Sequence, residues 1–281
     1  MNIFKALIVS VLLGSVGQAN DTFDNPNFLR LLANPATYRY APKYDVKFKS
    51  NFNINSICGV NNLQHVSEYD GLRGQPIEFV KMHQHAVAAI AKGSPPATSK
   101  YCSGTMISED LFLTAAHCVS YDILNEYVVF NYQKINGVVD LNMQEHFTVN
   151  EIVEQGINKL DYAILRINGK PGLKYGFTKI NINEVPEGTT LTIVQHPMGN
   201  PKMVDIGRRQ GIRGDNYMTY GDLDTQGGSS GSGVLDQNGL IVAVHTHGGC
   251  TSSGGENGGT LMTKIALASK VVQELTGAVS K

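Results

Sequence analysis

A glycine-rich segment that holds three serines is the part of this 281-residue sequence best suited to nucleophilic chemistry. It reads Thr225-Gln226-Gly227-Gly228-Ser229-Ser230-Gly231-Ser232-Gly233-Val234. Glycines on both sides of a serine let the backbone turn tightly, so that a hydroxyl and two backbone N–H groups can point into one small space. Taken alone, this composition is more typical of a surface loop. A nucleophile is therefore predicted only if the chain also supplies a base and an orienting acid.

A candidate base lies in a second segment, which runs from Leu113 to Cys118. His117 follows two small alanines, which leave room for the imidazole to face a neighbour, and it precedes a cysteine that can pair with Cys102. Closing a loop of this size would contribute roughly 3 kcal/mol to stability in the chain-entropy model and would hold the imidazole against the preceding strand. A lone histidine in an apolar context is otherwise more often structural.

A candidate acid begins a third segment, Asp161-Tyr162-Ala163-Ile164-Leu165-Arg166-Ile167. A carboxylate at the start of a nearly continuous apolar strand is unusual, because burying it without a partner is expensive. The cost falls if the carboxylate accepts a hydrogen bond from an imidazole N–H. Considered by itself, Asp161 has the position of a strand-start cap.

The three segments place His, Asp and Ser in one of the chain orders known for the Ser-His-Asp triad. The sequence resembles the chymotrypsin-fold serine peptidases, from about residue 56 to the C-terminus, through Thr114-Ala115-Ala116-His117-Cys118, Asp161-Tyr162-Ala163-Ile164-Leu165 and Gly228-Ser229-Ser230-Gly231-Ser232. The resemblance implies an all-β fold of two antiparallel six-stranded β-barrels. The catalytic groups would lie in the cleft between the barrels, and a C-terminal helix would pack outside.

The resemblance also implies a role for each of these residues. Ser230 would attack the scissile carbonyl, His117 would accept its proton and later pass it to the leaving amine, and Asp161 would fix the imidazole tautomer. The backbone N–H groups of Gly228 and Ser230 would form the oxyanion hole. Losing one donor of such a hole typically lowers the rate about 100- to 1,000-fold.

The residues around Ser230 indicate a branch of the family. Ser229 stands where the digestive enzymes have an aspartate that pairs with the new N-terminal ammonium, so the usual activation switch is predicted to be absent. Ser229 and Ser232 are rival nucleophiles, but only Ser230 fits the glycine-x-serine-glycine frame. With residues 195–202, including the predicted turn residue His196, this segment resembles the bacterial glutamyl endopeptidases and staphylococcal exfoliative toxins. Gly233 stands where most of that branch has proline, as in the toxins.

Two readings of the substrate pocket follow from the resemblance. Residues 244–249 are similar to the pocket wall of glutamyl endopeptidases, so His245 and Thr225 would bind an acidic side chain through an imidazolium and a hydroxyl. The alternative uses Asp224, which lies six residues before the nucleophile, where trypsin-like enzymes keep the aspartate that binds Lys or Arg. Asp-Thr also occurs here in the glutamyl-type branch, so Asp224 need not face the pocket. His247 is interpreted as a rim histidine.

The four cysteines, Cys58, Cys102, Cys118 and Cys250, allow three pairings. Their separations provide no close metal-ligand doublets, which argues against a structural zinc site. If Cys102 pairs with Cys118, Cys58 and Cys250 remain, and we hypothesise a second disulfide that holds the mature N-terminus beside the pocket. The segment from Ser56 weakly resembles the opening of mature glutamyl endopeptidases, where the terminal amine helps to bind the acidic residue.

The first 55 residues have the pattern of an export and processing segment. Residues 1–19 read as a signal peptide, because a short positive flank precedes an apolar run and small residues Gly17 and Ala19 precede a cleavage point. An uncleaved anchor is the alternative. Residues 20–55 are rich in Asn and are interpreted as a pro-segment, although an N-terminal extension retained in the mature protein is an equal alternative.

The remaining chain is expected to form two β-barrels. The first would span residues 56–170 and contain His117 and Asp161, and the second would span residues 171–281 and contain Ser230 and the terminal helix. The expected strands are short β-like runs at Phe79–Val80, Ser103–Ile107, Leu111–Thr114, Tyr127–Phe130, His146–Val153, Tyr162–Ile167, Leu191–Val194 and Leu240–His245. Helical periodicity is confined to Lys264–Leu275, and Gly277 suits the end of that helix.

The composition narrows the function. Charged residues make up 17% and the formal net charge is -1, which provides no basic field for nucleic acid or for an anionic membrane. We therefore predict a secreted bacterial serine endopeptidase, extracellular or periplasmic, that acts as a monomer on a protein or peptide substrate and uses no cofactor and no metal. A non-catalytic binding protein on the same scaffold is the alternative.

Overall fold

The computed structural model describes residues 55–156 and 160–278, and all of these belong to one compact unit. The predicted signal peptide and all but the last residue of the predicted pro-segment lie outside the described residues. No helix in the described part of the chain is long and apolar enough to cross a membrane.

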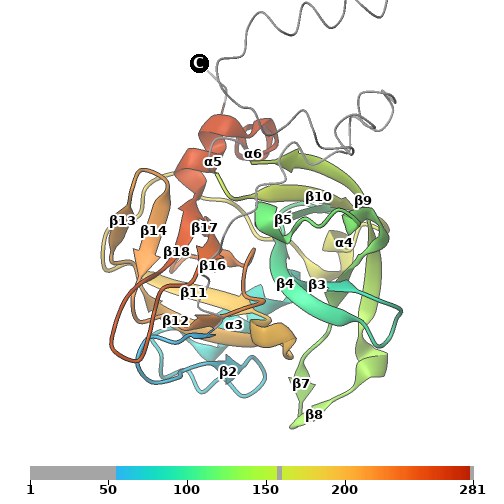
Figure 1. Ribbon diagram of the computed structural model, residues 1–281, viewed down its shortest axis with the longest axis horizontal. Coiled ribbons are helices and arrows are strands. Elements are labelled where there is room, and N and C mark those ends of the chain that lie inside the picture. The colour runs from blue at the N-terminus through green and yellow to red at the C-terminus, as the bar shows by residue number, and fades with distance from the viewer. Residues whose placement is uncertain (1–54, 157–159, 279–281) are drawn as a thin grey trace, which may run out of the picture. The chain divides into compact units, whose positions relative to one another are not determined.

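Strands dominate the described chain (Figure 1). Up to residue 167 they are β1 (Asn55–Ser56), β2 (Gln64–His65), β3 (Val87–Lys92), β4 (Ser99–Met106), β5 (Leu111–Thr114), β6 (Tyr127–Phe130), β7 (Lys134–Ile135), β8 (Val138–Val139), β9 (Glu145–Gln155) and β10 (Ala163–Ile167). Beyond it they are β11 (Thr190–Gln195), β12 (Met203–Arg208), β13 (Gly211–Arg213), β14 (Tyr217–Tyr220), β15 (Thr225–Gln226), β16 (Gly233–Leu235), β17 (Ile241–His247) and β18 (Asn257–Leu261). The helices are α3 (Ile77–His83), α4 (Gly172–Tyr175), α5 (Met262–Ala268) and α6 (Lys270–Thr276).

Six strands close into an antiparallel barrel in the order β10-β5-β4-β3-β6-β9, drawn in teal to yellow-green in Figure 1. Two of its strands, β5 and β6, have the bounds that the sequence predicts. The barrel core is filled by fully buried apolar side chains, among them Ile90, Met106, Phe112, Leu113, Val128, Phe130 and Ile164. The first predicted six-stranded barrel is thus confirmed, and closure leaves none of these six strands with an unpaired edge.

The second part is an eight-stranded antiparallel sheet, in the order β13-β14-β18-β17-β16-β11-β12-β2. The all-β fold class is confirmed, but in the described chain this sheet differs from the closed six-stranded barrel that the resemblance implies. One of its eight strands comes from outside the second half, because β2 pairs with the edge of β12 and places His65 opposite Met203. The β13–β14 hairpin forms the other end.

Two expectations about helices are corrected. Phe79 and Val80, expected in a strand, lie in α3, where Ile77 and Val80 pack against the buried Val66 and Tyr69. Spacing of three residues puts these two apolar side chains on one helical face, so a helix buries them together. In the sequence, the adjacent apolar residues Phe79 and Val80 fit a helix and a short strand equally well.

The predicted C-terminal helix is interrupted at Ser269, where the backbone is extended with φ -97° and ψ 117°. The Ser269 hydroxyl accepts the Val272 N–H at 3.0 Å and so caps α6. The Glu154 carboxylate on β9 accepts a hydrogen bond from the same hydroxyl and, at 3.1 Å, from the Val271 N–H. The break is therefore stabilised by the barrel. Gly277 ends α6 with φ 68°, as predicted.

We expect Glu154→Gln to lower the free energy of unfolding by about 1–2 kcal/mol, because hydrogen bonds to charged groups are stronger than those to amides. Amide exchange should rise at the start of α6. Urea unfolding and hydrogen exchange measure both. Glu151→Gln is the control on the same strand, since Glu151 binds Arg166 at a partly exposed position and should change stability by less than about 0.5 kcal/mol. Equal stability of the two variants would contradict the anchoring role.

Candidate active site

The barrel register brings the candidate base and acid together. His117 lies in a 3₁₀ turn, Ala116–Cys118, that follows β5, and Asp161 lies two residues before β10. β5 and β10 are antiparallel neighbours, with Thr114 opposite Ala163. The residues that leave β5 and those that enter β10 therefore emerge at the same end of the barrel.

Asp161 and His117 are joined by two hydrogen bonds. The ring Nδ1 of His117 lies 2.6 Å from Oδ2 of Asp161, and the His117 backbone N–H donates to Oδ1 at 3.1 Å. The Asp161 side chain is 2% exposed and that of His117 is 18% exposed. Burial alone would raise the pKa of Asp161, but the bonds and charge of His117 outweigh it and hold the pKa below its usual value. An ionised Asp161 favours the tautomer of a neutral imidazole with the proton on Nδ1, in which Nε2 is the nitrogen that can act as a base.

The nucleophile segment lies against the turn that carries His117. The Ser230 carbonyl accepts the Ser103 N–H at 2.9 Å and lies 3.5 Å from Sγ of Cys118. A Cβ at Gly231, where φ is +90°, would lie 2.1 Å from Oγ1 of Thr114, so only glycine fits there. The structure thus brings together the three motif segments that the sequence singled out.

Each backbone carbonyl in the nucleophile loop, residues 227–230, is held by a donor. Met198 N–H donates to the Gly227 carbonyl at 2.5 Å, the Ser103 hydroxyl to that of Gly228 at 2.8 Å, and Ser232 N–H to that of Ser229 at 3.1 Å. The Ser230 carbonyl is held by Ser103, as described above. These four bonds fix the orientation of four successive peptide planes.

The N–H groups of the same loop divide into two sets. Ser229 N–H donates to Gln226 at 3.0 Å and Gly231 N–H donates to His245 at 2.8 Å. Among the described residues, the N–H groups of Gly228 and Ser230 donate to no protein acceptor. Because N–H and C=O of a trans peptide point in opposite directions, the bond from Met198 to Gly227 turns the Gly228 N–H away from Met198. The two predicted oxyanion donors are the ones that remain open.

The rival serines have other surroundings. The Ser229 hydroxyl accepts the Gln226 N–H at 3.1 Å and is fully buried. The Ser232 hydroxyl is also buried and finds no hydrogen-bond partner among the described residues. Both rival serines are fully buried, whereas Ser230 is partly exposed, which makes Ser230 the best candidate.

His245 is buried behind the nucleophile loop. The Tyr220 hydroxyl lies 2.6 Å from its Nδ1. Burial, followed by the charges of His247 and His117, lowers the pKa of His245 to about 3. At neutral pH the ring is therefore neutral, unlike the imidazolium that the resemblance implies. The Thr225 hydroxyl is buried and unpaired in the described chain.

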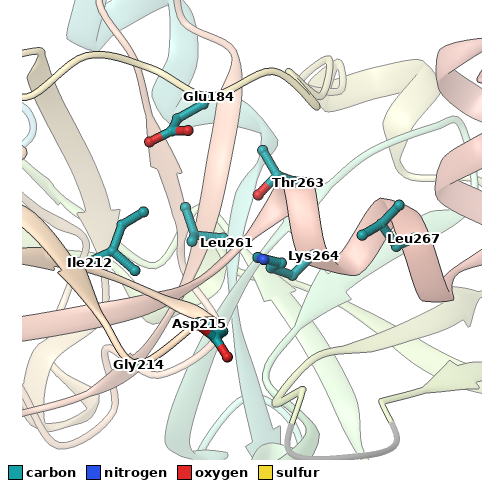
Figure 2. A pocket seen from close by; sticks show the side chains of 8 residues that line it. All are labelled: Glu184, Ile212, Gly214, Asp215, Leu261, Thr263, Lys264 and Leu267. Atoms are coloured by element: carbon teal, nitrogen blue, oxygen red, sulfur yellow. The ribbon is translucent and has the colours of Figure 1, made fainter.

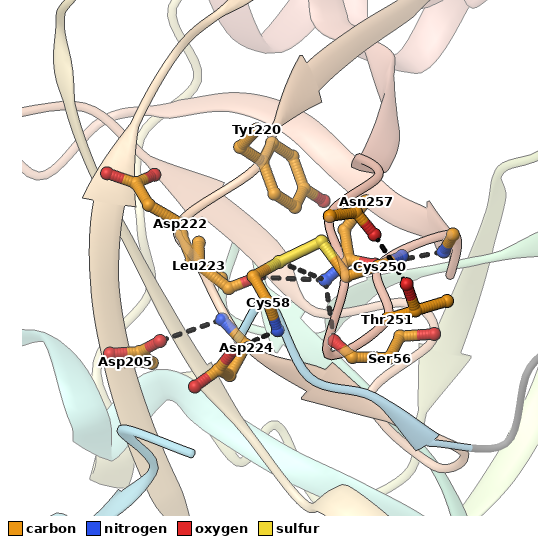
Figure 3. The surroundings of a disulfide bond; sticks show 12 residues. Ser56, Cys58, Asp205, Tyr220, Asp222, Leu223, Asp224, Cys250, Thr251 and Asn257 are labelled. Carbon is orange, nitrogen blue, oxygen red and sulfur yellow. Dashed lines mark hydrogen bonds between the residues drawn. A yellow bond between two sulfur atoms is a disulfide. The ribbon is translucent and has the colours of Figure 1, made fainter. Parts of the chain in front are cut away.

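Asp224 has a structural setting. Its Oδ1 accepts the Cys58 N–H at 2.7 Å and its Oδ2 accepts the Asn62 N–H at 2.6 Å. Figure 3 shows the carboxylate beside the segment that carries Cys58. Since both oxygens bind backbone N–H groups, Asp224 fixes the N-terminal segment, and the alternative reading of Asp224 as a binder of Lys or Arg gains no support.

Both disulfides of the hypothesised pattern are present, Cys102–Cys118 and Cys58–Cys250. The second joins the start of the described chain to the loop after β17. β1 adds to this attachment by pairing with β15, which places Ser56 opposite Thr225. The hypothesised pairing is confirmed, while the part of the hypothesis that places a mature N-terminus beside the substrate pocket stays a prediction.

Asn257 is a part of this attachment that the sequence did not reveal. Its Nδ2 donates to the carbonyls of Ser56 and Leu223, both at 2.9 Å (Figure 3). Its Oδ1 accepts the N–H groups of Gly249 and Cys250 at 3.0 and 3.1 Å. One fully buried amide thus connects three segments, and no local motif signals such a residue.

The other predicted histidines are structural. His196 is fully buried; its N–H donates to the Ser103 hydroxyl at 2.9 Å and its Nδ1 lies 3.0 Å from the Asn200 carbonyl oxygen. Burial, followed by the charge of Lys202, lowers the pKa of His196 to about 3. His247 is partly buried, with its ring edge-on to Tyr217 at 4.4 Å between centroids. These positions agree with the turn and rim interpretations.

One group with metal-ligand spacing occurs in the described chain, formed by Cys102, His117 and Cys118. Both sulfurs belong to a disulfide, so neither is available as a thiolate ligand. A surface pocket lies elsewhere (Figure 2), between α5 and the β13–β14 hairpin; its walls are Glu184, Ile212, Gly214, Asp215, Leu261, Thr263, Lys264 and Leu267. None of these residues belongs to the triad or the nucleophile loop.

Comparison with known proteins agrees with this geometry. The family model described as Trypsin-like peptidase domain matches residues 102–244, which include His117, Asp161 and Ser230. The chain belongs to the trypsin-like peptidase family. The match confirms the resemblance at the level of the family, and the narrower bacterial branch stays a prediction.

Individual relatives of this trypsin-like peptidase are distant. It is 25% identical over 215 residues to Secreted RxLR effector protein 73 of Plasmopara viticola, covering 70% of this chain and 52% of that one. The chain therefore spans about half the length of this curated relative. A solved Glu endopeptidase is 24% identical with a TM-score of 0.52, and the match covers 79% of this chain and 97% of that one. A serine endoprotease from Yersinia pestis has 21% identity and a TM-score of 0.51, covering 72% and 66%. The solved structures support the fold alone.

We expect Asp224→Asn to destabilise the protein by about 1–3 kcal/mol, because one of the two partly buried backbone N–H groups loses its acceptor. Thermal unfolding measures the loss. Asp222→Asn is the control, since Asp222 is exposed and its remaining amide oxygen can still accept the Arg208 N–H. Unchanged stability of Asp224→Asn, together with loss of cleavage after Lys or Arg, would contradict the structural role.

Proposed function

We propose that the chain is a serine endopeptidase that hydrolyses peptide bonds through Ser230, His117 and Asp161. The observation that carries the proposal is the buried Asp161–His117 pair beside the nucleophile loop. A carboxylate buried this deeply is costly unless donors compensate for its lost hydration, and a neutral His117 that donates from Nδ1 is held in the single imidazole tautomer that acyl transfer requires. The open N–H groups of Gly228 and Ser230 give the loop the donors that an oxyanion needs.

The reaction follows from these positions. Ser230 Oγ forms a bond to the scissile carbonyl carbon while its proton moves to Nε2 of His117. The carbonyl electron pair moves to the oxygen, which the N–H groups of Gly228 and Ser230 stabilise. His117 then protonates the leaving amine, the C–N bond breaks and an acyl-enzyme remains. Water, deprotonated by His117, releases the acid and restores Ser230.

We further propose cleavage after Glu or Asp, as in the glutamyl endopeptidase branch. Thr225 supports this assignment because its buried hydroxyl has no partner in the described chain and can donate to a substrate carboxylate. His245, neutral in the free protein, bonds the Tyr220 hydroxyl and the Gly258 backbone through its ring, so it would exchange one of these partners to bind a substrate carboxylate. Arg213 adds positive charge nearby, since its guanidinium lies 4.0 Å from a Cβ built on Gly249 in the predicted pocket wall.

The proposal extends to export and processing. Cleavage after residue 19 would release the exported chain, and removal of residues 20–55 would create a terminal amine close to the Cys58–Cys250 disulfide. That amine would be a further positive group for an acidic substrate side chain. A monomer suffices for this chemistry, because every proposed catalytic residue comes from one chain.

A non-catalytic binding protein is the second candidate, because the curated relative is named as an effector rather than as a peptidase. We expect a fluorophosphonate probe to label the processed wild-type protein and to leave Ser230→Ala unlabelled. Labelling is read by fluorescence in a gel. Ser229→Ala serves as the neighbouring control and should lose stability through its Gln226 bond, yet still react. Labelling that persists in Ser230→Ala would show that another residue is the nucleophile. A wild-type protein that is not labelled would favour the non-catalytic binding protein.

Substrate preference is tested with fluorogenic peptides that differ only in the residue before the cleaved bond. We expect Glu and Asp peptides to be preferred, and His245→Ala to lower kcat/KM for the Glu peptide about 10- to 100-fold, which corresponds to the loss of one or two polar contacts. The kcat/KM for the matching Gln peptide should fall less, because the Gln side chain carries no negative charge that the pocket must stabilise. His85→Ala, an exposed histidine, is the control. Preference for Lys or Arg would defeat the acidic assignment.

A further inference from the structure

Two polar groups of Ser103, its hydroxyl and its backbone N–H, link the closed barrel to the nucleophile loop. It lies in β4, directly after Cys102, and is fully buried. Its hydroxyl donates to the Gly228 carbonyl at 2.8 Å and accepts the His196 N–H at 2.9 Å. Its backbone N–H donates to the Ser230 carbonyl at 2.9 Å. The same residue therefore reaches both residues that carry the proposed oxyanion donors.

The hydrogen bond from the Ser103 hydroxyl constrains the backbone of Gly228, which has no side chain to restrict it. Gly228 has φ +94°, a conformation open to glycine, and glycine has the greatest backbone freedom of any residue. Its φ and ψ are set by the planes of the two peptides that flank it. Met198 holds the carbonyl of the preceding peptide and the Ser103 hydroxyl holds the carbonyl of the following one. The bond from Met198 fixes the plane that contains the Gly228 N–H, and the bond from Ser103 fixes the next plane and with it the φ and ψ of Gly228.

The surrounding packing makes the hydroxyl hard to replace. A Cβ at Gly228 would lie 2.7 Å from the His196 carbonyl oxygen, so the loop is in close contact with the segment that the same hydroxyl binds. Without the hydroxyl, both the Gly228 carbonyl and the His196 N–H would lose a partner in a buried environment. Rotation of the peptide between Gly228 and Ser229 is the simplest way for the carbonyl to regain a partner, and the accompanying change in the Gly228 conformation would move its N–H out of line.

We infer that Ser103 is a positioning residue of the oxyanion hole: its hydroxyl fixes the peptide that follows Gly228 and so holds Gly228 in the conformation in which its N–H faces the developing negative charge. The inference rests on the proposed peptidase function. It assigns catalytic importance to a residue of the first barrel that touches neither the substrate nor the triad side chains. A group that acts only on the transition state should change kcat and leave KM almost unchanged.

The test compares Ser103→Ala with Thr105→Val in the full processed protein. Thr105 lies two residues further along β4, is fully buried, and its hydroxyl accepts the Gly233 N–H at 3.2 Å, outside residues 227–230. Both variants therefore lose a buried hydroxyl bond between the same two parts of the fold. Active-site titration with the fluorophosphonate corrects each rate for the folded, reactive fraction.

For Ser103→Ala we expect kcat to fall about 10- to 100-fold, less than the loss of a whole donor, with KM within about twofold of wild type. Binding of a peptide aldehyde, whose hemiacetal oxygen occupies the hole, should weaken by the same factor as kcat. Thr105→Val should keep the wild-type kcat, and Ser103→Thr, which retains the hydroxyl, should recover most of the lost rate. If Ser103→Ala does not fold, Ser103→Cys, a weaker donor of similar size, replaces it under the same criteria.

The inference is overturned if Ser103→Ala and Thr105→Val have the same kcat, or if both variants weaken aldehyde binding by the same factor. The proposed function fails separately, through activity that persists in Ser230→Ala. An inactive Ser230→Ala beside a fully active Ser103→Ala would thus reject the positioning role and leave the peptidase intact.

Discussion

The buried carboxylate of Asp161 is the constraint on which the site depends. A carboxylate that is 2% exposed must find hydrogen-bond donors, and His117 supplies two of them, one from its ring and one from its backbone. Both bonds require the ends of β5 and β10 to stay in one register. Closure of the six-stranded barrel provides that register, because neither strand has a free edge along which to slip.

The second part of the fold completes the candidate site with the Ser230 hydroxyl and with backbone N–H groups of the same loop. In the nucleophile loop, glycines at 228 and 231 allow close approach to His196 and Thr114, and each carbonyl finds a donor. What remains is a pair of open N–H groups on either side of Ser229. Buried backbone groups need hydrogen-bond partners, and this requirement fixes the conformation of the loop. The N–H groups of Gly228 and Ser230, which find no protein acceptor in the described chain, are the donors that an oxyanion could use.

The N-terminal segment is built into this arrangement. Asp224, Asn257 and the Cys58–Cys250 disulfide attach residues 55–62 to the strands that lead to and from the predicted pocket. In the digestive members of the family that the chain resembles, an aspartate directly before the nucleophile pairs with the N-terminal ammonium that activation creates. Here that position is Ser229, which caps the turn at Gln226, and attachment is made further back in the loop by Asp224.

Local features of the site could be predicted from sequence. The spacing of apolar residues predicts β5 and β6 at their observed bounds, and the order of His117, Asp161 and Ser230 predicts the segments that meet. These predictions succeed because strand alternation, tight glycine turns and family motifs are written in consecutive residues. The pairing of Cys58 with Cys250 could be hypothesised by elimination, once a partner for Cys102 was assumed.

Only the tertiary structure decided the remaining features. The neutral state of His245 comes from complete burial and from the charges of His247 and His117. The use of Asp224 by two backbone N–H groups joins residues more than 160 positions apart. The break at Ser269 depends on Glu154, and the part played by Ser103 depends on a loop 125 residues away. Each of these is set by partners that are distant in the chain, and burial and hydrogen bonding between distant segments leave no periodic trace in the sequence.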